Sequence, residues 1–273
     1  MDVELHFLGT GAAEGIPAAG CNCRHCRIAR ERGGRYLRRR SAILVTVDGF
    51  RLLVDAPPDL FEILNHYNIF ELDAVYITHS HYDHVGGLRE FEHWPRPLEL
   101  FLGADVEVEF TDELVRIFDV VRFLPYAQLD FDTFTLTPLK VDHTVPTYGL
   151  VVRTDGHKIV ITSDTSAKLS SYQLHIMRGA DILVANTPAL EEGALSSHLS
   201  VTEALRLARR LDVGVLVLTH INHHNLPYDE LVEFVRERSE DFRCVVAYDG
   251  LRVRLGEGVE VLDERPSLKA KLP

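Results

Sequence analysis

The chain has 273 residues, 46% of them hydrophobic, and its formal net charge at pH 7 is −12. A chain of this size can bury enough apolar surface to fold as one domain without disulfides, and no apolar run reaches the roughly 20 residues that cross a bilayer. The negative charge disfavours a general nucleic-acid binder, since phosphate backbones attract clustered Lys and Arg. Met1–Glu4 lacks the basic and apolar regions of a secretory leader. We therefore expect a cytoplasmic protein that binds no membrane.

Alternating strand and helix patterns follow one another along the chain. Runs rich in β-branched and apolar residues predict strands at Val3–Leu8, Ser41–Val47, Arg51–Val54, Ala74–Thr78, Leu98–Leu102, Thr133–Pro138, Gly149–Arg153, Lys158–Thr162, Ile182–Ala185, Val215–Thr219 and Cys244–Tyr248. Helices are predicted near Asp59–Tyr67, Asp112–Val121, Ser170–Arg178, Val201–Leu211 and Asp229–Ser239, the fourth opened by a capping box of Ser200 and Glu203. This order indicates an α/β sandwich. We expect only the tail from about Arg265 to be loose.

A weak internal repeat relates the two halves of the chain. Gly49–Asp55 resembles Gly156–Ile161, which is followed by an acid at Asp164, and Val75–His81 resembles Val217–His223. In each pair an apolar strand ends in polar, ligand-type residues. Because ligands of α/β sheets bind at the carboxyl ends of strands, residues about 140 positions apart are expected to share one site.

The run His79-Ser80-His81-Tyr82-Asp83-His84 places four ligand-type side chains directly after a predicted buried strand. A lone histidine is usually a bystander, but four such groups at one strand end would crowd lone pairs together with nothing to satisfy them. A cation resolves this arrangement. His79 and His81 are two apart on an extended segment and point the same way, whereas Asp83 and His84 follow one turn later. We therefore predict two metal sites.

The missing ligands are expected at other strand ends, at His143, Asp164 and His220. The preferred assignment gives the first ion His79, His81 and His143, and the second ion Asp83, His84 and His220, with Asp164 bridging both. Such a pair of divalent ions activates water and stabilises charge in a displacement. Zn²⁺, Mn²⁺ and Fe suit these ligands about equally well.

A second cluster, Cys21-Asn22-Cys23-Arg24-His25-Cys26, has three thiols on one loop. Three thiolates make most of a structural zinc site, with a redox pair or buried unligated thiols as the alternatives. The fourth ligand is expected to be His223, with His224 and His25 as rivals. Such a site would rigidify the loop at about 11–40. Residues 21–40 also carry eight arginines against one acid, Glu31, which is either a solvated face or an anion-binding segment.

The chain resembles the metallo-β-lactamase superfamily over about residues 3–254. The residues that carry the resemblance are Asp55, the motif His79–His84, the later His143, Ser163–Thr165 and Thr219-His220. The resemblance implies a four-layer αββα sandwich and a hydrolase with a binuclear centre. It is specific for the fold and the metals and much less so for the substrate.

Within this superfamily the sequence resembles the phosphoribosyl cyclic phosphate phosphodiesterases of the carbon–phosphorus lyase pathway. The segments that carry this narrower resemblance are Gly9-Thr10-Gly11, the cysteine loop, Pro146–Gly149 and Thr219–His223. That resemblance implies a zinc held by Cys21, Cys23, Cys26 and His223, and it maps a histidine that contacts the phosphate or leaving group onto His198. The sequence departs from the pattern at Asn186, where an acid is expected. Pyrroloquinoline quinone biosynthesis B proteins share the same framework.

The expected activity is hydrolysis of a small, cyclic ribose-type phosphodiester, with Asp83, Asp164 and His198 as catalytic residues. A second substrate phosphate is expected to bind the guanidinium groups of Arg35, Arg38, Arg39 and Arg40. A transfer-RNA 3′-processing nuclease needs an extended basic arm, which this acidic chain lacks. A thioester or lactam hydrolase leaves the arginines unexplained, and a non-catalytic scaffold has no need of a bridging Asp. A homodimer is compatible with an enzyme of this size.

Overall fold

The computed structural model describes residues 3–262. Its first sheet has eight strands, in the order β15 (Val259–Leu262), β14 (Arg252–Leu255), β1 (Val3–Gly9), β2 (Ala42–Val47), β3 (Phe50–Val54), β4 (Ala74–Ile77), β5 (Leu98–Gly103) and β6 (Phe118–Phe123). The strands from β15 to β3 are antiparallel to their neighbours. From β3 to β6 the strands are parallel, so this half of the sheet has its strand carboxyl ends at one edge.

The second sheet has seven strands, in the order β13 (Arg243–Val246), β12 (Val215–Thr219), β11 (Ile182–Asn186), β10 (Lys158–Ile161), β9 (Thr147–Thr154), β8 (Phe134–Val141) and β7 (Leu129–Asp130). The strands from β7 to β10 are antiparallel, and those from β10 to β13 are parallel. Each sheet therefore joins an antiparallel half to a parallel half, and the repeated segments Gly49–Asp55 and Gly156–Ile161 lie where the two halves of each sheet meet.

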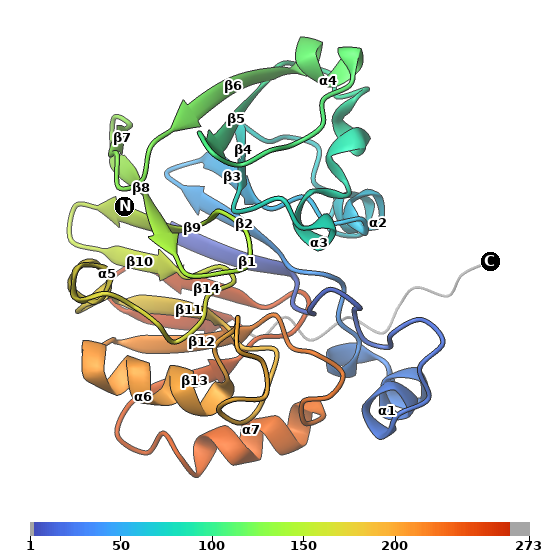
Figure 1. Cartoon of the computed structure of the whole chain (residues 1–273), viewed down its shortest axis with the longest axis vertical. Helices are drawn as coiled ribbons and strands as arrows, with labels where there is room; N and C mark the ends of the chain where they lie inside the picture. The colour runs from blue at the N-terminus through green and yellow to red at the C-terminus, as the bar shows by residue number, and fades with distance from the viewer. Residues whose placement is uncertain (1–2, 263–273) are drawn as a thin grey trace.

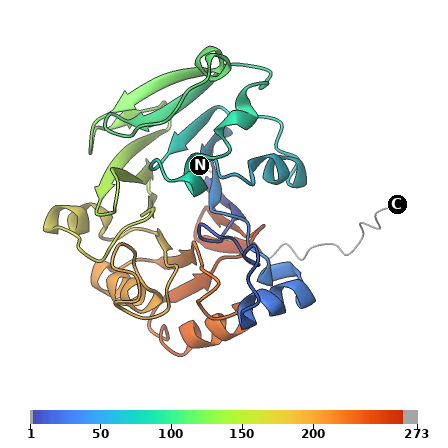
Figure 2. The same cartoon turned by 45° about the vertical axis from the view of Figure 1, so that its right-hand side comes forward.

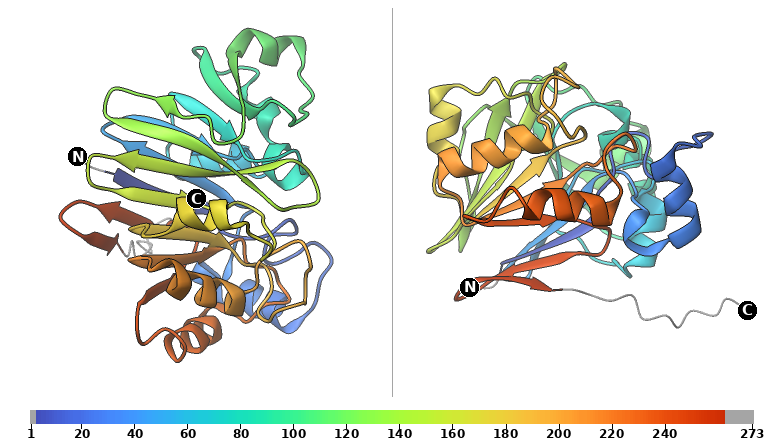
Figure 3. Two further views of the ribbon diagram at one scale, coloured as in Figure 1. Left: turned by 60° about the vertical axis from the view of Figure 1, so that its left-hand side comes forward. Right: turned by 90° about the horizontal axis from the view of Figure 1, so that it is seen from below.

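The two sheets stack face to face and helices cover their outer faces (Figures 1 and 3). Alternate residues of β10 show this: Ile159 and Ile161 belong to the core shared with the first sheet, whereas Val160 packs with the helix residues Met177 and Leu205. This period of two is what a strand buried on both faces requires. The helices are α2 (Leu60–His66), α3 (Tyr82–Val85), η2 (Leu88–Phe91) and α4 (Asp112–Ile117) on the first sheet, and α5 (Ser171–Met177), α6 (Val201–Leu211) and α7 (Tyr228–Arg236) on the second.

The predicted four-layer α/β sandwich is confirmed, but one predicted helix is wrong beyond its first turns. The helix expected over Asp112–Val121 ends at Ile117, and β6 begins at Phe118. The residues from Phe118 onward pair in parallel with β5, because their aromatic and β-branched side chains fit a sheet better than a helix. Strands β7, β14 and β15 were not predicted. The loose tail expected from about Arg265 lies outside the described residues.

The segment at about 11–40 is more regular than the expected loop, because it contains α1 (Arg24–Arg32) and the 3₁₀ turn η1 (Gly34–Tyr36). Figure 2 shows α1 beside α7, far along the chain. An ion pair between Arg24 and Glu230 joins the two helices. Within residues 3–262 no helix is long and apolar enough to cross a membrane.

Candidate metal centre

The predicted ligands meet at the edge where the parallel strands end. Three residues there have left-handed backbone conformations although none is glycine: Asp55 after β3, Ser163 after β10 and His220 after β12, with φ of 66°, 56° and 58°. Such conformations are rare outside glycine and concentrate at functional sites. Asp55 directly follows β3, and Ser163 directly precedes Asp164 after β10. The turn after each strand therefore aims its side chains at one point.

One group of potential ligands contains His79, His81, His143 and Asp164, whose donor atoms all lie within 4.8 Å of one another. His79 Nε2 lies 3.1 Å from His81 Nδ1 and 3.6 Å from Asp164 Oδ2. His143 Nε2 lies 3.7 Å from the same Asp164 oxygen. These separations suit donor atoms that surround one cation at about 2.0–2.2 Å each. The structure thus brings together the set expected for the first ion.

A second group contains Asp83, His84 and His220, again with donor atoms within 4.8 Å. His84 Nε2 lies 3.2 Å from Asp83 Oδ2 and 3.5 Å from Asp164 Oδ2. His220 Nε2 lies 3.5 Å from Asp164 Oδ1. The Asp164 carboxylate therefore approaches both groups, in the position expected of a bridging residue.

Buried neighbours orient the histidine rings. Asp55 Oδ2 accepts hydrogen bonds from His84 Nδ1 at 2.7 Å and from Thr78 Oγ1 at 3.0 Å, and Thr78 Oγ1 in turn lies 2.9 Å from His79 Nδ1. His143 Nδ1 donates to the Ser197 carbonyl at 3.0 Å. Each contact occupies Nδ1 and leaves Nε2 as the ring nitrogen directed into the cluster. Asp55 was visible in the sequence as part of the resemblance, but the roles of Thr78 and Ser197 were not predicted.

The residues fit a cation by their chemistry. His84 Nε2 is buried and has no hydrogen-bond partner, although buried polar atoms nearly always have one. Burial opposes ionisation of Asp164, yet His220 and His84 keep its pKa well below the usual value. Burial also favours neutral His84, but Asp55 and Asp164 raise its pKa well above the usual value. The centre thus collects negative charge that a divalent cation would balance.

Asn186 donates from Nδ2 to Asp164 Oδ1 at 2.8 Å. It ends β11 and is buried. An acid at this place, as the resemblance suggested, would set two carboxylates against each other. The amide instead fixes the orientation of Asp164, which gives this departure from the family pattern a structural meaning.

A cavity of about 210 Å³ opens above the centre, and His81, Asp83, Asp164 and His220 form part of its wall. His198 also lines it, with Nδ1 3.8 Å from Asp164 Oδ1. Burial lowers the pKa of His198 to about 4, against the opposing effect of Asp164.

The start of α6 fixes the position of His198. Ser200 accepts from the Glu203 amide, and the Glu203 carboxylate accepts from the Ser200 amide. The predicted capping box is thus confirmed, and it sets where the chain leaves the loop that carries His198.

The cysteine cluster gathers as expected. Cys21, Cys23, Cys26 and His223 have donor atoms within 4.8 Å of one another, and His223 Nδ1 lies 3.4 Å from Cys21 Sγ. The rival His25 instead contacts the Asn225 carbonyl at 3.1 Å. Burial opposes ionisation of Cys23, but hydrogen bonds from the Cys26 amide and from His223 bring its pKa down to about 6. A low pKa of this kind suits a thiol that ligates metal as thiolate.

The structure does not bring the four arginines expected at the substrate into the cavity. Arg35 lies over the rings of Tyr228 and Tyr248, and Arg38 donates to Thr10 and to the Ala247 carbonyl. Arg39 donates to Glu62, and Arg40 donates to Asp59 and to the Ala13 carbonyl. Arg38 is 2% exposed. These guanidinium groups tie the N-terminal segment to α2, to α7 and to the loops after β1 and β13, and Arg40 supports the loop that forms one wall of the cavity.

Two stacked mixed sheets with a histidine–aspartate cluster at their shared edge define the metallo-β-lactamase fold. Residues 50–221 match the Beta-lactamase superfamily domain, and the chain belongs to this superfamily. A solved structure described as a new diphosphatase from the PhnP family superposes with a TM-score of 0.76 at 23% identity, covering 96% of this chain and 99% of that one.

Two curated relatives extend the comparison. A probable metallo-hydrolase, YhfI of Bacillus subtilis, is 29% identical over 201 residues, which are 67% of this chain and 80% of that protein. An octanoyltransferase of Porphyromonas gingivalis is 26% identical over 278 residues, which are 95% of this chain and 53% of the relative. The chain thus spans about half the length of the octanoyltransferase. Family and centre together support a metal-dependent hydrolase.

Proposed function

We propose that this chain is a two-metal phosphodiesterase that hydrolyses a small phosphodiester, with a cyclic ribose phosphodiester as the favoured kind. The observation that carries the proposal is the meeting of two ligand groups at Asp164, beneath a cavity that also contains His198. One divalent ion would be held by His79, His81 and His143. The other ion would be held by Asp83, His84 and His220, and Asp164 would bind both ions. Zn²⁺ and Mn²⁺ suit these ligands, and Fe also fits.

When bound, the two ions would supply a nucleophilic water and positive charge for the phosphate oxygens. The residues of the chain contribute orientation and a proton. Asn186 holds the Asp164 carboxylate in place, and Asp55 holds the ring of His84. His198 faces the cavity and donates a proton to the ester oxygen that leaves phosphorus. A bound phosphodiester anion favours protonated His198, because nearby negative charge raises the pKa of an imidazole.

The size of the cavity and the net charge of the chain favour this proposal over its alternatives. A cavity of about 210 Å³ suits a small molecule, and the net charge of −12 disfavours a transfer RNA as substrate. The likeness to a PhnP-family diphosphatase supports phosphorus chemistry over a thioester or lactam. A pyrroloquinoline quinone biosynthesis B-like role and a non-catalytic scaffold are the remaining alternatives. We further propose a structural zinc at Cys21, Cys23, Cys26 and His223.

Hydrolysis of bis(p-nitrophenyl) phosphate tests the function. The purified protein should release p-nitrophenol, lose this activity after treatment with a chelator, and regain it with Zn²⁺ or Mn²⁺. The variant His198→Ala should lose roughly 10²–10⁴-fold in turnover, the usual contribution of a positioned acid, while its metal content stays unchanged. His175→Ala, an exposed histidine on α5, is the control. No hydrolysis with any metal would favour the scaffold, and metal loss in His198→Ala would make His198 a ligand.

A further inference from the structure

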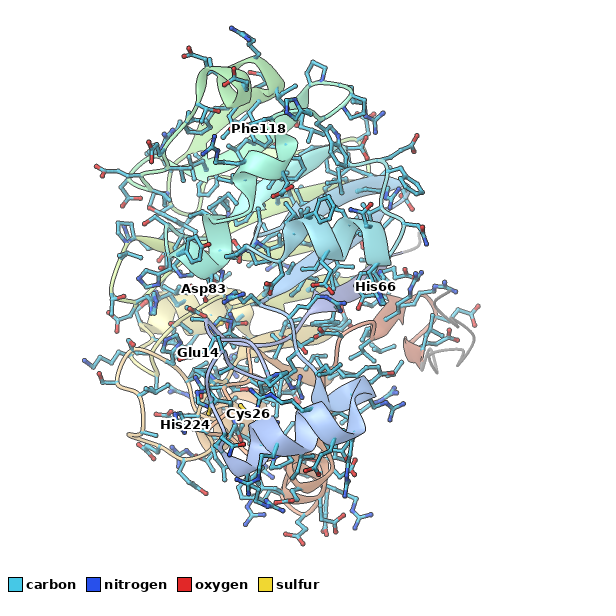
Figure 4. All side chains as sticks on the ribbon, turned by 90° about the vertical axis from the view of Figure 1, so that its right-hand side faces the viewer. Glu14, Cys26, His66, Asp83, Phe118 and His224 are labelled. Carbon is cyan, nitrogen blue, oxygen red and sulfur yellow. The ribbon has the colours of Figure 1, made fainter. Side chains whose placement is uncertain are left out.

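One wall of the cavity comes from the N-terminal segment and contains an acid. Glu14 lines the cavity together with Asp83, Asp164 and His198. Figure 4 shows Glu14 below Asp83, on the side of the molecule that carries Cys26 and His224. Because Glu14 lines the same cavity as the metal-ligand carboxylates of Asp83 and Asp164, a substrate held at the metal centre lies near the Glu14 carboxylate.

The backbone of the segment around Glu14 is fixed. Ala12 to Gly15 form a tight turn in which the Gly15 amide donates to the Ala12 carbonyl at 2.9 Å, and Gly15 has a φ of 65°. The Ala12 amide donates to the Ile221 carbonyl at 3.1 Å. Glu14 thus stands at the tip of a turn that is anchored to the loop after β12.

The side chain of Glu14 is also oriented. Asn222 Nδ2 donates to Glu14 Oε2 at 2.8 Å, and Asn222 Oδ1 accepts from the His224 amide at 2.9 Å. Because the oxygen of the Asn222 amide is taken by a backbone donor, its nitrogen must face Glu14. One carboxylate oxygen is therefore held by Asn222, and the other remains an acceptor for a ligand.

Within residues 3–262, neither lysine nor arginine lines the cavity. Arg40 lies near the loop, but its Nη1 pairs with Asp59 at 2.7 Å and its Nε donates to the Ala13 carbonyl at 2.6 Å. Two divalent ions and a protonated His198, set against the carboxylates of Asp55, Asp83 and Asp164, would leave a net charge of about +2, which a nucleophilic hydroxide and one phosphodiester would neutralise. A second anionic group on the substrate would then lie near the Glu14 carboxylate, which repels it.

We propose that Glu14 is a specificity-determining residue that selects phosphodiesters bearing hydroxyl or amino groups near the reacting phosphate and rejects those with a second anionic group. This inference rests on the proposed function and narrows its substrate class. The free carboxylate oxygen accepts a hydrogen bond from a hydroxyl or pairs with an ammonium, and it repels a further phosphate or carboxylate. In this respect the proposed site differs from a site that binds a second substrate phosphate through arginines.

A charge series of synthetic substrates tests the inference. Four p-nitrophenyl phosphodiesters with tails of equal length end in methyl, hydroxyl, ammonium or carboxylate, and kcat/KM is measured for each with the metal-loaded protein. Because the side chain of Glu14 is exposed, solvent weakens its field, and the ammonium probe should exceed the carboxylate probe by about tenfold with the hydroxyl probe between them. Glu14→Gln should remove the discrimination by charge, and Glu14→Lys should reverse it. Glu113→Lys, the same charge change on exposed α4, should leave it unchanged.

Calorimetric titration with the monoester products provides a readout that does not depend on turnover. The amino-tailed phosphate should bind the wild-type protein about tenfold more tightly than the carboxy-tailed one, and Glu14→Lys should invert that order. If the methyl probe is not hydrolysed with any metal, the proposed function fails. If all four probes are hydrolysed alike, and the Glu14 variants keep the wild-type ratios, the selectivity assigned to Glu14 is wrong while the phosphodiesterase stands.

Discussion

Replacing Asp55 by Asn is predicted to weaken metal binding at both halves of the centre, although Asp55 is in neither ligand group. Asp55 Oδ1 accepts from the Thr78 amide at 2.9 Å, and Oδ2 accepts from Thr78 Oγ1 and from His84 Nδ1. All these donors are buried. Through Thr78 the carboxylate also sets the ring of His79. One residue thus determines which nitrogen faces the metal in two histidines.

The magnitude follows from the single oxygen that Asn offers. If its amide nitrogen faces His84, Nδ1 must become an acceptor and the proton moves to Nε2, the nitrogen that a metal needs. If the nitrogen faces the Thr78 amide, two donors oppose each other in a buried site, which costs about 1–3 kcal/mol. Loss of such an orienting partner usually lowers metal affinity about 10–100-fold, or roughly 1.4–2.7 kcal/mol.

The assay is competition for Zn²⁺ between the protein and a chromophoric chelator, with metal content measured by mass spectrometry after dialysis. Asp73→Asn is the matched control, because Asp73 accepts from the Arg51 amide at 2.8 Å at the opposite end of β3. Circular dichroism should show both variants folded. Wild-type affinity for both ions in a folded Asp55→Asn variant would refute the reasoning about ring orientation.

Two further predictions concern stability. His223→Ala should bind one Zn²⁺ fewer per chain and unfold at a lower temperature, whereas His224→Ala should match the wild type; equal metal content in both would remove His223 from the cysteine site. Burial lowers the pKa of His6 to about 3, against about 6.5 in an unfolded chain, so only the unfolded form takes up this proton as the pH falls from 6.5 toward 3. Stability should therefore fall with acid by about 1.4 kcal/mol per pH unit from this residue. Urea unfolding at pH 7 and pH 5 should show a loss about 2 kcal/mol smaller in His6→Phe, and an unchanged loss would contradict the assignment.

Local pattern was enough to place the strand ends that build the centre. Asp164 and His220 each follow a short apolar run bounded by polar residues, and such runs become strands wherever both faces are buried. The predicted ligand assignment also placed His220 with His84, whose ring centroids lie 5.4 Å apart. The order of strands within the sheets was not predicted. The sequence repeat relates β4 to β12, but β4 lies next to β3 in the first sheet as β11 lies next to β10 in the second.

Other features of the structure depend on contacts between residues far apart in the sequence, which local sequence patterns do not reveal. The apolar spacing over Asp112–Val121 fits a helix, and only pairing with β5 turns its second half into β6. Similarly, the arginine-rich segment has the composition of an anion site, but composition does not reveal that Arg38 is buried against Thr10 and Ala247. His223 and His224 are adjacent, and only the path of the loop after β12 sets His223 against the thiols.

The contact between Cys23 and His223 joins positions 200 residues apart, and that between Glu14 and Asn222 joins positions 208 apart. During synthesis at about 5–20 residues per second, the thiols therefore leave the ribosome roughly 10–40 s before their histidine does. Over that interval the cysteines are open to adventitious ions and to oxidants. The first segment to be translated is thus among the last to reach its native place, and the wall of the cavity that carries Glu14 is completed only when the second sheet has formed.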